Sequence, residues 1–108
     1  MNVRLYVWQR ATAAVMVPLV AAHLVIIFWA TRRGFSAADV LARTRGSIAW
    51  AGFYGTFVVA AAIHAAIGLR NILLEWLMVG GRKLDAAAWL IGLALLGLGL
   101  RAVAAVVL

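Results

Sequence analysis

Three long apolar stretches dominate this chain of 108 residues and limit what it can fold into. They cover approximately residues 6–31, 47–76 and 86–108, and each supplies the roughly 20 apolar residues that a helix needs to cross a bilayer. The chain is 68% hydrophobic and 12% charged, whereas a soluble domain carries about a quarter charged residues. We therefore expect an all-α membrane protein in which three transmembrane helices run up-down-up and form a single domain.

The two connections between these stretches predict how the helices are joined. In the first connection, Ser36 is followed three positions later by Asp39, which is typical of a capping box at the start of a helix. We expect a short interfacial helix there. The second connection is short and contains glycine, so helices two and three should be antiparallel neighbours, and Asp85 is expected to cap the third helix. The first stretch is longer than the apolar part of a usual signal peptide and is interpreted as a mature span.

The charged residues and the absence of cysteine exclude several kinds of partner and site. Ten Lys and Arg against three Asp and Glu give a formal charge of +7. The basic residues stand singly or in pairs between apolar runs, so the chain lacks the clustered basic surface of a nucleic-acid-binding protein. Without cysteine, the chain itself holds no disulfide, thiolate metal site or iron–sulfur cluster. The basic residues divide almost evenly between the two sides of the membrane, so they do not set the orientation.

Polar side chains inside the spans are the candidates for function, because each must find a partner in the membrane. At helical spacing, His64, Gly68 and Glu75 lie on one stripe of the second span, together with Asn71. An imidazole with a glycine one turn further on suits a flat buried prosthetic group, since glycine leaves room for a ring and imidazole binds its metal. The alternative is that His64, and His23 in the first span, only form hydrogen bonds to neighbouring helices.

The two histidines are expected at different depths. With a rise of about 1.5 Å per residue, His23 should lie about 22 Å and His64 about 12 Å below the surface on the amino-terminal side. Two imidazoles that ligate one iron must lie at the same level, so this difference of about 10 Å argues against a haem held by the pair. A haem at either histidine would take its other ligand from another chain.

Two segments resemble a known family. The stretch HAAIGLRNILLEW at residues 64–76 resembles the second-helix signature of the membrane anchor and cytochrome b subunits of succinate dehydrogenase and fumarate reductase. Both have histidine, three residues, glycine, and then an acidic–aromatic pair at the helix end. The stretch QRATAAV at residues 9–15 is similar to the Arg-Ala-Thr-Ala that opens the first helix of the anchor subunit. The three-span layout extends the resemblance over nearly the whole chain.

The resemblance implies a subunit of a succinate:quinone oxidoreductase in the bacterial inner membrane, with its amino terminus on the cytoplasmic side. Such a subunit has no catalytic residue of its own. It docks the flavoprotein and iron–sulfur subunits, pairs with a second hydrophobic subunit in the bilayer, and helps to form the quinone site. His64 would be an axial ligand of haem b beside Gly68, and His23 would be a second iron ligand, as in the members with two haems.

The same resemblance implies that Arg10, Glu75 and Trp76 lie at the quinone site. Arg10 would stabilise negative charge that develops on a quinone oxygen. Glu75 would relay protons, or would instead pair with Arg70 or with an arginine of a partner. Trp76 stands where the family usually has tyrosine, and its indole N–H donates a hydrogen bond but accepts none.

Two other functions stay open at this point. The chain would be a small non-enzymatic membrane protein, such as an assembly factor or a transporter component, if the histidines only hold helices together. It would be the cytochrome b subunit of another quinone-linked complex if it binds haem but has other partners.

Overall fold

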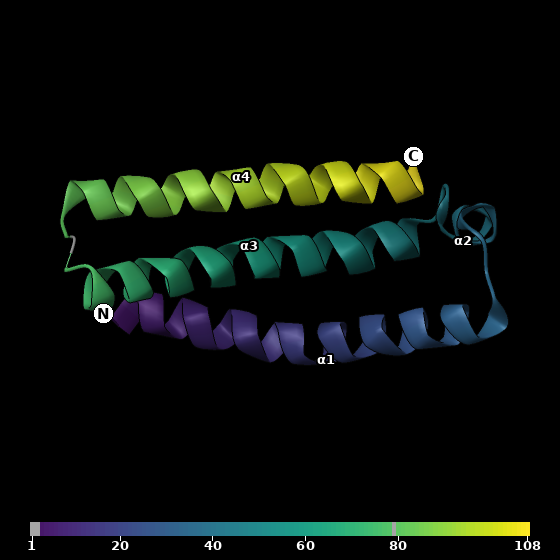
Figure 1. Cartoon of the computed structure of the whole chain (residues 1–108), viewed down its shortest axis with the longest axis horizontal. Helices are drawn as coiled ribbons and strands as arrows, with labels where there is room; N and C mark the ends of the chain where they lie inside the picture. Colours follow the sequence, from purple (N-terminus) through teal and green to yellow (C-terminus); the bar gives the residue numbers. More distant parts are fainter. Residues whose placement is uncertain (1–2, 79) are drawn as a thin grey trace.

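Three long helices lie side by side in the computed structural model, which describes residues 3–78 and 80–108. The elements are α1 (Val3–Arg33), α2 (Ala37–Thr44), α3 (Ile48–Trp76) and α4 (Arg82–Val107). Figure 1 shows α3 between α1 and α4, with the short α2 at the end where α1 leads into α3. The expected all-α, up-down-up architecture with an interfacial helix after the first span is confirmed.

The outer surface of this assembly is apolar over most of its length. The molecule is 48 Å long, close to the roughly 40–45 Å of a bilayer with its headgroups. In the most apolar windows of α1, α3 and α4, only 6%, 11% and 6% of the residues are buried inside the chain. Large side chains such as Val17, Phe28 and Leu98 are each at least 65% exposed. Lipid or other subunits must cover this surface, because water would solvate it poorly.

The start of α2 follows the sequence prediction. The Ser36 hydroxyl accepts a hydrogen bond from the backbone N–H of Asp39 at 3.2 Å, and the Asp39 carboxylate accepts one from the backbone N–H of Ser36 at 2.8 Å. The predicted capping box is therefore confirmed. The chain reaches this cap through Gly34, whose φ of 69° lets it turn directly after α1.

The start of α4 differs from the prediction. Asp85 was expected to cap the third helix, but α4 already begins at Arg82, after Gly81 as its N-cap residue. The φ of 74° at Gly81 turns the chain earlier than expected. The prediction for Asp85 is therefore wrong: its carboxylate lies within the first turn of α4 and bonds to Arg70 of α3.

Small residues bring α3 and α4 close together. A Cβ atom added at Gly92 would lie 3.2 Å from the Cβ of Ala66, and one added at Gly99 would overlap the side chain of Val58. Glycine at these positions lets the two backbones approach, as is common between membrane helices.

The corner between α2 and α3 holds the end of α4. The Thr44 hydroxyl donates to the carbonyl of Val106 at 2.6 Å, and the backbone N–H of Gly46 donates to the carbonyl of Val107 at 2.8 Å. Carbonyls in the last turn of a helix have no partner within the helix. The corner satisfies two of them and fixes α2 against α4.

Candidate functional site

His64 lies against α1, where it meets the buried side chain of Thr12. The His64 Nδ1 atom is 3.3 Å from the Thr12 hydroxyl oxygen. Thr12 is 6% exposed, and its hydroxyl also lies 2.8 Å from the carbonyl oxygen of Trp8 and 3.1 Å from that of Gln9. Helix α1 thus presents a single buried hydroxyl to the imidazole of α3.

This contact favours the tautomer of His64 that carries its hydrogen on Nδ1. A hydroxyl has one hydrogen to donate, and at Thr12 the carbonyls of its own helix take it. The hydroxyl can then only accept from His64, so the ring hydrogen is on Nδ1. In that tautomer the lone pair is on Nε2, which has no hydrogen-bond partner among residues 3–78 and 80–108.

Gly68 lies one turn beyond His64 and also faces α1. A Cβ atom added at Gly68 would lie 3.4 Å from the side-chain nitrogen of Gln9. The space that the glycine leaves is therefore next to the Gln9 amide. The amide oxygen of Gln9 is buried without a hydrogen-bond partner in the described part of the chain.

His23 lies in a different part of the bundle. Its ring makes edge contacts with Tyr54 and Phe57 of α3, with 5.5 Å between ring centroids in each case. Its Nδ1 atom is buried and has no hydrogen-bond partner within residues 3–78 and 80–108. The ring borders a cavity of about 350 Å³ that α2 and the end of α4 also line.

The two histidines lie at different levels, as the sequence predicts. His64 packs beside Thr12, whereas His23 packs beside Phe57, which precedes His64 by seven residues and about 10 Å along α3. The structure therefore does not bring His23 and His64 together around one central atom.

Arg10, Glu75 and Trp76 belong to the end of the bundle where α1 begins and α3 ends (Figure 1). The Arg10 guanidinium lies 5.8 Å from the ring centroid of Tyr6. Glu75 is exposed and Trp76 is 80% exposed. Within the described residues, these three side chains share one end of the molecule, and no hydrogen bond, ion pair or ring contact joins them.

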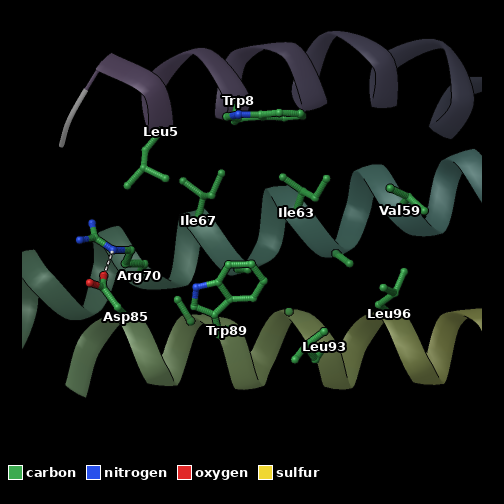
Figure 2. A pocket seen from close by; sticks show the side chains of 14 residues that line it. Leu5, Trp8, Val59, Ile63, Ile67, Arg70, Asp85, Trp89, Leu93 and Leu96 are labelled. Atoms are coloured by element: carbon green, nitrogen blue, oxygen red, sulfur yellow. Dashed lines mark hydrogen bonds and ion pairs between the residues drawn. The ribbon is translucent and has the colours of Figure 1, made fainter. Parts of the chain in front are cut away.

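Arg70 takes a partner that the sequence analysis did not anticipate. Its Nε atom lies 3.0 Å from Oδ1 of Asp85, and Figure 2 shows this pair at one end of a groove lined by α1, α3 and α4. The expected alternative, a pair between Arg70 and Glu75, is not formed. The short turn between α3 and α4 was the signal for this contact, because it brings the last turns of α3 beside the first turns of α4.

The comparison with protein families agrees with this architecture. The chain matches the family described as the succinate dehydrogenase/fumarate reductase transmembrane subunit over residues 1–106. The chain belongs to this family. Comparison with curated proteins and with solved structures gave no match. Membership in the succinate dehydrogenase/fumarate reductase transmembrane subunit family implies that the protein works in the membrane, in association with the other subunits of such a complex.

Proposed function

We propose that this chain is the haem b-binding membrane anchor of a succinate:quinone oxidoreductase. In this role it docks the flavoprotein and iron–sulfur subunits at the end of the bundle that carries the amino terminus, and it pairs in the bilayer with a second hydrophobic subunit. We place it in the bacterial inner membrane with the amino terminus on the cytoplasmic side. The observation that carries the proposal is the contact between Nδ1 of His64 and the Thr12 hydroxyl, which leaves Nε2 of an intramembrane imidazole free for a metal in a chain of this family.

The geometry of His64 fits an axial haem ligand. Histidines that bind a metal usually donate their other ring N–H to a nearby acceptor, which fixes the ring orientation and the tautomer. At His64 the Thr12 hydroxyl is that acceptor, and Nε2 keeps its lone pair for iron. Haem bound there would accept and pass on single electrons between the iron–sulfur subunit and quinone.

Gly68 and Gln9 are compatible with a flat ring beside His64. The Gln9 amide occupies the space next to Gly68, so it would have to move when a ring enters. Its buried amide oxygen makes no hydrogen bond within the described residues, so the movement breaks no bond at that atom. We propose Gly68 as the residue that leaves room for the edge of the ring.

The opposite ligand of this haem would come from the second hydrophobic subunit. His23 lies about 10 Å away along the helix axis, too far to share the iron with His64. His23 is also the weaker candidate for a haem of its own, because its Nδ1 lacks the hydrogen-bond acceptor that Thr12 supplies to His64. We retain His23 as the ligand of a second haem b, to be tested separately.

The quinone site would lie at the end of the bundle that carries Arg10, Glu75 and Trp76. Arg10 would donate to a quinone oxygen as negative charge develops on it. Trp76 would contribute an N–H donor, and Glu75, which is exposed in the single chain, would pass protons towards the quinone. Arg10→Ala should abolish quinone reductase activity and leave the haem spectrum intact; full activity would remove Arg10 from the site.

A spectrum of membranes with the complete complex tests the haem assignment. The reduced-minus-oxidised difference spectrum should show a b-type signal, and the part of it that belongs to the haem at His64 should disappear in His64→Ala. His23→Ala is compared with it, because His23 is retained as the ligand of a second haem b at another level of the same bundle. An unchanged spectrum in His64→Ala would refute the ligand assignment and favour a small membrane protein whose histidines only hold helices together. A smaller signal in His23→Ala would indicate a second haem.

A further inference from the structure

A groove of about 580 Å³ runs along one face of α3, with α1 on one side and α4 on the other. Figure 2 shows its apolar walls, with Leu5 and Trp8 on α1, Ile63 on α3 and Leu93 on α4. Its charged side chains are Arg70 and Asp85, which lie at one end. An elongated apolar molecule with one polar end matches this distribution.

The groove is separate from the region proposed for haem. At about 100° per residue, Ile63 in the groove and Gly68 beside His64 lie about 140° apart around α3. Neither His64 nor Gly68 lines the groove. An occupant of the groove would therefore leave the His64 side of α3 free.

The length of the groove matches one leaflet of a bilayer. Its lining extends from Arg70 to Val59 on α3 and from Asp85 to Leu96 on α4. Each of these segments advances eleven residues, or about 16 Å. Half of a hydrocarbon core of roughly 30 Å is about 15 Å. A transmembrane helix of a partner would need a groove across the whole core, whereas a lipid acyl chain needs only this half.

The polar end of the groove is suited to a phosphate group. Asp85 binds Nε of Arg70, so it orients the guanidinium, and the side chains of the pair are 22% and 58% exposed. The two terminal nitrogens of Arg70 carry further N–H donors, in the planar geometry that binds phosphate with two hydrogen bonds. Arg4 precedes Leu5 in the chain, and Arg82 and Lys83 share the first turn of α4 with Asp85.

Arg4, Arg82 and Lys83 outnumber Glu75 among the other charged residues at this end of the bundle, and this excess of positive charge favours a negatively charged headgroup. Trp8 and Trp89 also line the groove and are 51% and 71% exposed. Tryptophan is common at the level of lipid headgroups. We propose that the groove binds one anionic phospholipid, with an acyl chain along α3 and the phosphate at Arg70.

Native mass spectrometry of the complex tests this proposal. The complex is purified in mild detergent from membranes that contain phosphatidylglycerol, and the retained lipids are counted. One anionic phospholipid per chain is expected. Arg70→Gln should lower its retention about tenfold, as the loss of charge-assisted hydrogen bonds predicts. Arg45→Gln is the matched control, because it removes an exposed arginine at the other end of the molecule and should retain the lipid.

A second variant and a second measurement test the proposal even if Arg70→Gln fails to fold. Leu93→Trp should narrow the groove and displace the lipid while all charges are kept. Delipidated wild-type complex should gain thermal stability in phosphatidylglycerol nanodiscs relative to phosphatidylcholine nanodiscs. Equal retention in Arg70→Gln and Arg45→Gln would overturn the proposal, as would equal stability in the two kinds of nanodisc. Recovery of a quinone, or a crosslink to a partner helix, from the groove would also overturn it.

Discussion

Thr12 is the residue on which the state of His64 depends. Its hydroxyl donates its one hydrogen to the carbonyls of its own helix, and its oxygen can accept a hydrogen bond from Nδ1 of the imidazole. Such an acceptor makes the imidazole a more basic ligand. If His64 binds haem iron as proposed, Thr12 would act on the iron through His64, as a positioning residue that does not itself contact the haem.

Thr12→Val should leave the His64 N–H without its acceptor at nearly constant side-chain volume. We expect haem affinity to fall by about 10-fold or more and the midpoint potential of the remaining haem to rise, because a less basic imidazole stabilises oxidised iron less well. Potentiometric titration of the complex measures the potential. Thr12→Ser keeps the hydroxyl and should restore the wild-type value, whereas equal potentials in Thr12→Val and wild type would show that Thr12 does not act on the ligand.

At the scale of the helices, two nearby glycines of α4 differ in how closely α3 approaches them. A Cβ atom at Gly99 would overlap Val58 of α3, whereas one at Gly97 would meet no atom within 4 Å among the described residues. Gly99→Ala should therefore push α4 away from α3 and destabilise the chain by about 1–3 kcal/mol, the usual cost of overpacking.

Gly97→Ala is the matched control and should be nearly neutral, since both substitutions add one methyl group to the same helix. Thermal unfolding of the two variants in one detergent measures the difference. Equal melting temperatures would contradict the close contact between Gly99 and Val58.

The capping box of α2 should respond to pH. Hydrogen bonds from the backbone and side chain of Ser36 lower the pKa of Asp39 below its ordinary value of 3.8, and Arg43 lowers it further. A carboxyl group whose pKa is lowered on folding contributes stability that is present above the ordinary value. This contribution is lost as the pH falls through the lowered pKa of the folded state.

Amide hydrogen exchange of α2 checks this dependence. At pH 6 the amides of Ser36 and Val40 should exchange more slowly in the wild type than in Asp39→Asn. As the pH falls below 3.8, the ratio of the two rates should approach one, because protonated Asp39 no longer stabilises the cap. A ratio that does not change with pH would contradict the role of the Asp39 carboxylate.

At the scale of the whole molecule, the sequence predicts the architecture because the bilayer fixes the length of each span. Three long apolar runs required three long helices, and the Ser36–Asp39 pair marked the start of α2 correctly. The start of α4 was predicted wrongly, because the chain turns at Gly81 through its backbone conformation and not through a side-chain cap.

The side-chain neighbours could not be predicted in the same way. Transmembrane helices are apolar on all sides, so their sequences do not fix which face turns towards which helix. Helical spacing therefore placed His64 and Gly68 on one stripe but did not show that the stripe faces Thr12 and Gln9. The contact between Arg70 and Asp85 likewise depends on how α3 and α4 are rotated about their axes.

The large apolar surface of the single chain fits a subunit that is completed by lipid and by partners. Membership in the succinate dehydrogenase/fumarate reductase transmembrane subunit family agrees with this.

The central claim is that His64 binds haem iron together with a ligand from a companion subunit. An electron cryomicroscopy map of the purified complex tests it most directly. We expect haem density joined to Nε2 of His64, with an imidazole of the other hydrophobic subunit on the opposite face of the ring. Lipid or aliphatic side chains beside His64 in a fully assembled complex would contradict it.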